Sequence, residues 1–208
     1  MASGDSFKAK LDILARRYNI AMTSTDSSRE LTFILGGARS GKSAHAERLA
    51  AQSGLPVTYI ATASIGDAEF AERVRLHRER RPAHWTLVEA PLDLAGALLE
   101  ADAAGHCVLI DCLTLWLANL LFSSGSADAQ IATLPNGARA AFAQFDAALA
   151  QVRGKVIVVS NEIGLGVVPL GSVTRLYVDE LGRLNQRVAA ASTRATMMIA
   201  GLPLALKG

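Results

Sequence analysis

Short apolar runs alternate along this chain with longer stretches in which apolar residues recur every three or four positions. The runs predict six strands, at 31–36, 56–61, 85–89, 107–111, 155–160 and 196–200. Most of them are continuously apolar, which is typical of parallel strands covered by helices on both faces. The stretches between them predict helices near 42–53, 67–80, 93–102, 113–122, 136–153 and 172–191. This alternation predicts an α/β fold with a mostly parallel sheet flanked by helices.

The last predicted helix shows the pattern best. Val173, Tyr177, Leu181, Leu184 and Val188 recur at spacings of three and four residues, so they share one face of a helix. We expect that face to be buried against the sheet.

Residues 1–30 differ in character from the rest of the chain. Phe7, Leu11, Leu14 and Tyr18 fall on one helical face, and the polar stretch at 23–30 then breaks the pattern. Such a basic amphipathic helix docks on a membrane or partner, packs on the domain, or frays, and a start at Met22 would omit it. We therefore expect an N-terminal extension over 1–30, helical or flexible, followed by one domain over 31–208.

Composition narrows the class of protein. A chain of 208 residues, half of them apolar and with a net charge of +2, suits one globular domain. No apolar run reaches the roughly 18 residues of a membrane span, and the N-terminus lacks a secretory pattern, so we expect a cytoplasmic protein. Cys107 and Cys112 lie in an apolar segment and are interpreted as core residues. The mixed charges do not indicate a nucleic-acid partner.

The strongest chemical signal is "GGARSGKS" at 36–43, which matches the phosphate-binding pattern G-x-x-x-x-G-K-[ST] between a predicted strand and a predicted helix. Backbone N–H groups of such a loop hold phosphates, while the lysine neutralises β- and γ-oxygens and the serine hydroxyl binds Mg²⁺. The alternative is a purely structural strand–turn–helix connection that needs glycine and binds no phosphate. The predicted nucleotide-binding residues here are Gly36, Gly37, Ala38, Arg39, Ser40, Gly41, Lys42 and Ser43.

A second acidic strand is expected wherever a phosphate loop holds magnesium. Asp111 ends the apolar run 107–111, at the carboxyl edge where open α/β sheets collect ligands. It is predicted to bind Mg²⁺ with Ser43 or to contact the nucleotide; capping of the next helix is the alternative. Asn161 and Glu162, at the end of the run 155–160, are expected to face the same crevice.

A phosphate loop alone does not name a reaction, because kinases, ATPases and GTPases share it. Five ordered stretches are more specific: "GGARSGKSAHAE", "YIATA", "HRERRPAHW", "SNEIGLGVVP" and "GRLNQRVAAA". From about residue 31 onward they resemble the bifunctional adenosylcobinamide kinase / adenosylcobinamide-phosphate guanylyltransferase family of cobalamin biosynthesis.

This resemblance implies a RecA-like P-loop NTPase fold, assembly as a homotrimer, and two reactions. Adenosylcobinamide would be phosphorylated by ATP or GTP, and GMP would pass from GTP through a guanylyl-histidine to adenosylcobinamide phosphate, giving adenosyl-GDP-cobinamide and pyrophosphate. The nucleophile that the motif implies is His77, within a cluster of five arginines, Arg73, Arg75, Arg78, Arg80 and Arg81. Nearby cations would keep the imidazole neutral and stabilise charge on the triphosphate. From the residues alone, a solvated basic helix face is the alternative.

The resemblance also implies further GTP contacts. By matched motif position these are Ala61, Thr62, Ala63, Arg78, Glu79, Arg80, Arg81, Glu89 and Asp111. Residues 61–63 are otherwise a strand-end turn, and Glu89 otherwise ends its strand before Pro91. Two alternative functions stay open: a P-loop kinase or NTPase acting on another small molecule, and a GTP-regulated binding module. Neither would form a covalent guanylyl-enzyme.

Overall fold

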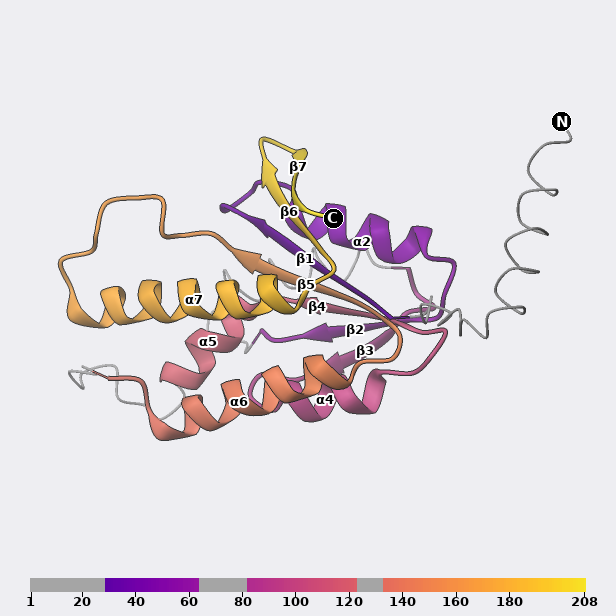
Figure 1. Cartoon of the computed structure of the whole chain (residues 1–208), viewed down its shortest axis with the longest axis horizontal. Helices are drawn as coiled ribbons and strands as arrows, with labels where there is room; N and C mark the ends of the chain where they lie inside the picture. The colour runs from indigo at the N-terminus through magenta and orange to yellow at the C-terminus, as the bar shows by residue number, and fades with distance from the viewer. Residues whose placement is uncertain (1–28, 64–81, 123–132) are drawn as a thin grey trace, which may run out of the picture.

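One seven-stranded sheet organises the part of the chain that the structure describes. The computed structural model describes residues 29–63, 82–122 and 133–208 (Figure 1). The strand order is β3-β2-β4-β5-β1-β6-β7; β1 to β6 pair in parallel, and only β7 is antiparallel, to β6. The strands are β1 Glu30–Gly36, β2 Val57–Ala61, β3 Thr86–Glu89, β4 Cys107–Asp111, β5 Lys155–Asn161, β6 Arg194–Ile199 and β7 Leu202–Lys207.

Helices cover the sheet unequally. In Figure 1, α2 lies on one side of the sheet, and α4, α5, α6 and α7 lie on the other. The larger apolar core therefore forms under the four helices, with Trp116 fully buried between the rings of Phe142 and Phe145 at 5.6 and 5.2 Å. A smaller core packs α2 against the opposite face. The helices are α2 Lys42–Gln52, α4 Leu94–Ala101, α5 Leu113–Phe122, α6 Asn136–Gln151 and α7 Ser172–Ala191.

The sequence pattern located these elements to within one or two residues. The six predicted strands correspond to β1 to β6, and five of the six predicted helices to α2, α4, α5, α6 and α7. The predicted stripe of α7 is confirmed, since Leu181, Leu184 and Val188 are buried. The predicted helix at 67–80 lies outside the described residues.

Strand β7 was not predicted. Its six residues, LPLALK, are all exposed, because β7 is the edge strand and no described element covers it. A run that contains Pro203 and directly follows the turn at Gly201 carries little of the pattern of a covered strand. Both cysteines are buried and free, as predicted.

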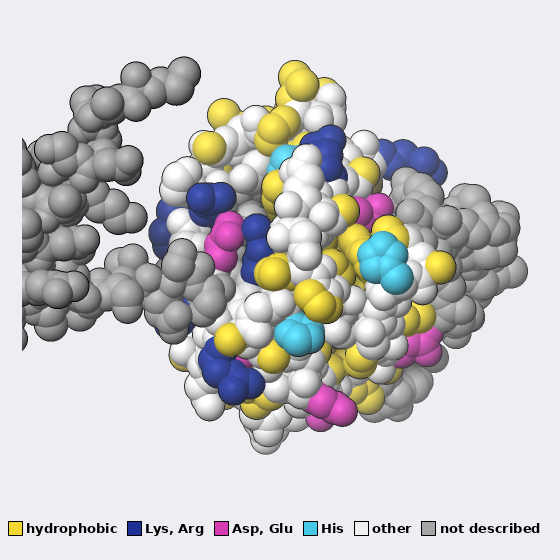
Figure 2. Space-filling view, turned by 90° about the vertical axis from the view of Figure 1, so that its right-hand side faces the viewer, with side chains coloured by type: hydrophobic (Ala, Val, Ile, Leu, Met, Phe, Trp, Pro, Cys, Tyr) yellow, Lys and Arg dark blue, Asp and Glu magenta, His cyan; other side chains and the backbone are white. Residues whose placement is uncertain are grey.

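The surface mixes charges of both signs. Figure 2 shows Lys and Arg side chains interspersed with Asp and Glu on the face that it presents. Glu30, for example, lies 3.2 Å from Lys155 and 3.3 Å from Arg194. Among the described residues, no helix is long and apolar enough to cross a membrane.

Candidate nucleotide-binding site

The loop at 36–43 connects β1 to α2 at the carboxyl edge of the sheet, and its first glycine is required by close packing. A Cβ on Gly36 would lie 2.4 Å from Ser40 Oγ and 2.9 Å from the backbone oxygen of Met198. Heavy atoms do not approach so closely without a shift of the backbone. The loop can therefore turn tightly against β6 only because residue 36 has no side chain.

The second glycine of the G-x-x-x-x-G-K-[ST] pattern is Gly41, and it sets the start of α2. Gly41 is the N-cap residue and has φ of 91°, a left-handed conformation that side chains disfavour. The adjacent Ser40 accepts a hydrogen bond from Gly201 N at 3.0 Å, which ties the loop to the β6–β7 turn. The first N–H groups of α2 consequently lie at the loop, where a helix N-terminus favours a bound anion.

Polar groups inside the loop suit a phosphate. Lys42 Nζ donates to Gly37 O at 3.2 Å, so the ammonium folds back over the loop. The Ser40 side chain is 8% exposed, and its buried hydroxyl has no hydrogen-bond partner among the described residues. A buried hydroxyl without a hydrogen-bond partner destabilises the fold, and a phosphate oxygen would accept a hydrogen bond from it.

Asp111, the acid predicted to bind Mg²⁺ or nucleotide, lies at the carboxyl edge of the sheet, two strands from β1. Asp111 ends β4 and is the register partner of Ala61 on β2, which in turn pairs with Glu89 on β3. The three residues thus lie at one level along the carboxyl edge. Tyr59 Oη donates to Asp111 Oδ2 at 3.1 Å, which fixes the direction of this carboxylate.

The charges of Lys42 and Asp111 both influence one buried thiol, that of Cys112. Burial raises the pKa of Cys112 to about 11; the negative charge of Asp111 adds to this shift, and the positive charge of Lys42 opposes it. The fixed cation of the loop and the strand-end carboxylate therefore lie within electrostatic reach of the same buried atom.

The side-chain oxygen atoms at this edge of the sheet are suitable ligands for Mg²⁺. Ser43 in the first turn of α2 offers a hydroxyl and Asp111 a carboxylate, and Mg²⁺ prefers such oxygen ligands. The described residues contain no group of three or more His, Cys, Asp or Glu side chains that could hold a metal. Mg²⁺ suits this sparse set, because it usually keeps several waters and binds substrate phosphates.

Thr62, an expected GTP contact, has a structural position. It is fully buried; its hydroxyl donates to Cys112 O at 2.7 Å and accepts from Cys112 N at 2.9 Å. Asn119 Nδ2 donates to Thr62 O at 2.7 Å. The side chain thereby joins the ends of β2 and β4, and its contact with GTP stays a prediction, as do those of Ala61 and Ala63 on either side.

The described structure places the loop 36–43, Ala61, Glu89, Asp111 and Asn161 along one edge of the sheet. Asn161 is the neighbour of Gly36, whereas Glu89, on the edge strand β3, lies four strands from β1. Glu162 N donates to Gly36 O at 3.1 Å, so Glu162 also adjoins the loop, as expected. The expected nucleophile and its neighbours, His77, Arg78, Glu79, Arg80 and Arg81, lie outside the described residues. Ala63 is the last described residue before them, at the carboxyl end of β2.

Sequence reasoning missed supporting residues of this site. Tyr59 orients Asp111, and Asn185 Nδ2 donates to Asn161 O at 3.0 Å from inside the core. Asn185 leaves a signal in the sequence, because it is a polar residue between Leu184 and Val188 on a buried helical face. His45 Nδ1 lies 2.7 Å from Arg48 Nη2; burial and the charge of Arg48 lower the pKa of His45.

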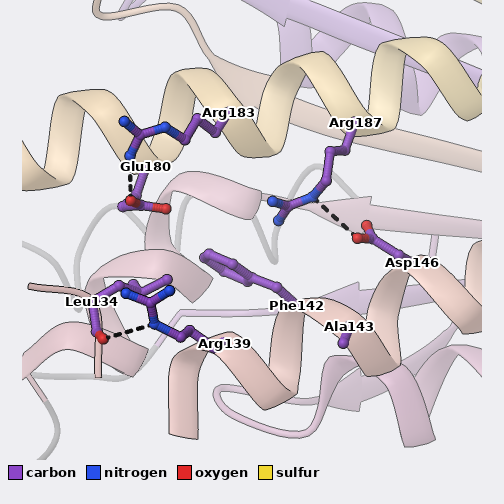
Figure 3. Close-up of a pocket in the computed structure, with 8 residues that line it drawn as sticks. All are labelled: Leu134, Arg139, Phe142, Ala143, Asp146, Glu180, Arg183 and Arg187. Carbon is purple, nitrogen blue, oxygen red and sulfur yellow. Dashed lines mark hydrogen bonds and ion pairs between the residues drawn. The ribbon is translucent and has the colours of Figure 1, made fainter. Parts of the chain in front are cut away.

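A second hollow, about 500 Å³ in volume, lies between α6 and α7 (Figure 3). Its charged groups are engaged with neighbours in the fold. Arg187 Nε lies 3.1 Å from Asp146 Oδ2, Arg183 pairs with Glu180, and Arg139 donates to the carbonyl of Leu134. Only the Arg187–Asp146 pair joins α7 to α6; the Arg183–Glu180 pair lies within α7, and the Arg139–Leu134 bond links α6 to the segment just before it.

The sheet, the loop and the strand-end acid define a P-loop nucleotide-binding protein of the mostly parallel α/β class. Residues 32–206 match the family model described as cobinamide kinase / cobinamide phosphate guanyltransferase, and the chain belongs to this family.

Two curated relatives are similar over nearly their whole length. The bifunctional adenosylcobalamin biosynthesis protein CobP of Pseudomonas aeruginosa is 54% identical over 175 residues, which are 84% of this chain and 96% of that protein. The protein CobU of Escherichia coli, of the same description, is 37% identical over 85% of this chain and 99% of its own. Among solved structures, the flagellar accessory protein FlaH of Methanocaldococcus jannaschii has a TM-score of 0.45 at 18% identity, over 86% of this chain and 78% of that one.

Proposed function

We propose that this protein phosphorylates adenosylcobinamide with ATP or GTP and then transfers GMP from GTP to adenosylcobinamide phosphate. The products of the second reaction are adenosyl-GDP-cobinamide and pyrophosphate. The observation that carries the proposal is the phosphate loop 36–43 beside Asp111, in a chain that belongs to the cobinamide kinase / cobinamide phosphate guanyltransferase family.

In the kinase step, the hydroxyl oxygen of cobinamide attacks the γ-phosphorus and loses its proton, and the nucleoside diphosphate leaves. The loop N–H groups and Lys42 bind the β- and γ-oxygens and stabilise the charge that develops on them. We propose that Ser43 and Asp111 hold Mg²⁺, which when bound neutralises phosphate charge. Glu89 is proposed to contact the base or the ribose of the nucleotide, whose hydroxyl and N–H donors a carboxylate accepts.

In the second reaction, we propose that a nitrogen of His77 attacks the α-phosphorus of GTP and that pyrophosphate leaves. The guanylyl-histidine is then attacked by a phosphate oxygen of cobinamide phosphate, which breaks the P–N bond and frees the imidazole. The cationic cluster Arg78, Arg80 and Arg81 is proposed to stabilise the triphosphate charge during the first of these steps.

Incubation with α-labelled GTP, followed by denaturing electrophoresis, tests the proposal. We expect a label that is acid-labile and base-stable, as a phosphoramidate is, and that moves to the corrinoid when cobinamide phosphate is added. His77→Ala should abolish the label and GMP transfer but retain phosphorylation of cobinamide, whereas Lys42→Ala should lose both reactions. A His77→Ala protein that still carries covalent GMP would refute the assignment of the nucleophile, and His45 would be tested next.

Three remaining expectations belong to this proposal. We propose that the enzyme works in the cytoplasm and that it is a homotrimer. Light scattering of the purified protein tests the oligomeric state. Residues 1–30 are proposed to be an extension outside the catalytic domain. A chain that starts at Met22 should then keep both activities, and loss of soluble protein on this truncation would contradict the assignment.

A further inference from the structure

A further cavity lies along the segment that follows β5, and the mechanism above does not use it. Its volume is about 430 Å³, and it lies between the segment that follows β5 and one face of α7. The segment begins at Glu162, whose N–H is bonded to Gly36 of the phosphate loop. This bond ties the start of the segment to the phosphate loop, at the edge of the sheet where phosphoryl transfer would occur.

The wall on the β5 side is an apolar loop, 163–170, exposed to solvent. Leu165, Val167, Val168 and Leu170 are 83%, 96%, 72% and 97% exposed. Bonds at both ends hold the loop in this position. Glu162 Oε1 accepts from Gly164 N at 2.6 Å, and Arg175 Nη1 donates to Pro169 O at 2.9 Å and also to Leu170 O. Val167 and Val168, together with Ile163, line the cavity, whereas Leu165 and Leu170 are exposed elsewhere on the same loop. Large apolar side chains exposed to solvent on a constrained loop indicate a binding surface.

The wall on the α7 side is polar and contains a glycine. Arg175, Asp179, Gly182 and Gln186 recur at spacings of three and four residues, so they form one stripe that faces the cavity. Gly182 lies in the middle of a 20-residue helix, where glycine destabilises relative to alanine. A Cβ at this position would meet nothing within 4 Å, so no packing constraint in the described structure requires glycine. Its absent side chain leaves the cavity open.

We infer that this cavity binds the corrin ring of the acceptor substrate, with the loop 163–170 against the apolar periphery of the macrocycle and α7 against its carboxamide side chains. The inference rests on the proposed function. A corrinoid carries both methyl groups and amides, which matches one apolar and one polar wall. A cavity of this volume takes an edge of so large a ligand.

The position of the cavity favours a substrate, rather than a second copy of this chain, as its occupant. An acceptor hydroxyl has to reach the γ-phosphorus in line with the leaving oxygen. Strand β5 is the immediate neighbour of β1, and the loop 163–170 begins two residues beyond Asn161, the partner of Gly36. A ligand in the cavity would therefore lie at the same edge of the sheet as phosphates bound by the loop.

The test uses Gly182→Leu, which fills the cavity, with Gly182→Ala as its matched control. A second variant, Val167→Ser/Val168→Ser, makes the loop polar, and Leu99→Gln is its control on an exposed apolar residue of α4. The measurements are KM for cobinamide and for GTP in the kinase reaction, equilibrium dialysis of cobinamide without nucleotide, and molar mass by light scattering. We expect KM and Kd for cobinamide to rise at least tenfold in both variants, with KM for GTP and both controls within twofold of the wild type.

Unchanged cobinamide affinity in Gly182→Leu and in the double variant would overturn the inference, as would an equal rise of both KM values. A lower molar mass in either variant would also overturn it, because the loop would then cover a second copy of the chain. Wild-type protein that binds cobinamide in dialysis without phosphorylating it would contradict the proposed function alone.

Discussion

Replacement of Gly36 by alanine should damage the phosphate loop by overpacking. The new Cβ would lie 2.4 Å from Ser40 Oγ, which can rotate away, and 2.9 Å from Met198 O, which cannot. That oxygen belongs to β6, the parallel neighbour of β1, so relief requires the two strands to separate at the loop. Overpacking of this kind costs about 1–3 kcal/mol. For a chain of this size we expect Tm to fall by about 2–12 °C.

Gly37→Ala is the matched control, one residue further along. A Cβ there meets nothing within 4 Å, and its φ is not among the positive values. Its stability should stay within about 1 kcal/mol of the wild type, on the stabilising side if anything, because alanine restricts the unfolded chain. Thermal unfolding of both variants, with GTP titration, makes the comparison, and GTP affinity of Gly36→Ala should fall at least tenfold. Equal stability and equal GTP affinity of Gly36→Ala and the wild type would refute this reasoning.

Two further predictions concern buried groups away from the loop. Asp102 is buried and accepts hydrogen bonds from Arg153 N at 2.8 Å and Gly154 N at 2.9 Å, so Asp102→Ala should lower the free energy of unfolding by about 2–4 kcal/mol in urea. Asp102→Asn, which keeps one acceptor oxygen, should lose less, and equal losses would contradict this account. Cys107 is fully buried, and burial raises its pKa to about 11. Neither it nor the buried Cys112 should react with a thiol reagent at pH 8 until the chain unfolds, and rapid labelling of the folded protein would show that the smaller core opens.

The elements of the fold and the centre of the site could be read from the sequence because both leave local patterns. Covered parallel strands are continuously apolar, and so β1, β4 and β5 stand out. The phosphate loop is one continuous motif, and the strand-end Asp111 follows from what magnesium needs. Each of these features depends on residues that are neighbours along the chain.

Features that depend on contacts between distant segments left no such pattern. The bonds between Thr62 and Cys112 join residues 50 positions apart, and the bond between Tyr59 and Asp111 spans 52. In the sequence, Gly182 is simply a glycine within a predicted helix. Its place in the lining of a cavity depends on the loop 163–170, which lies opposite it in the structure. An exposed edge strand such as β7 has no covered face to produce a periodicity.

The strand order has a consequence for the two proposed reactions. The phosphate loop follows β1 and the apolar loop follows β5 beside it. Strand β2, the last described strand before His77 along the chain, lies two strands beyond β5. Adjacent strands are about 4.8 Å apart, so the ends of β1 and β2 are separated by roughly 14 Å. The corrinoid is acceptor in both reactions, whereas the histidine acts in one. Gly182→Leu should therefore lower kcat/KM for cobinamide and for cobinamide phosphate alike, and His77→Ala should affect only the second.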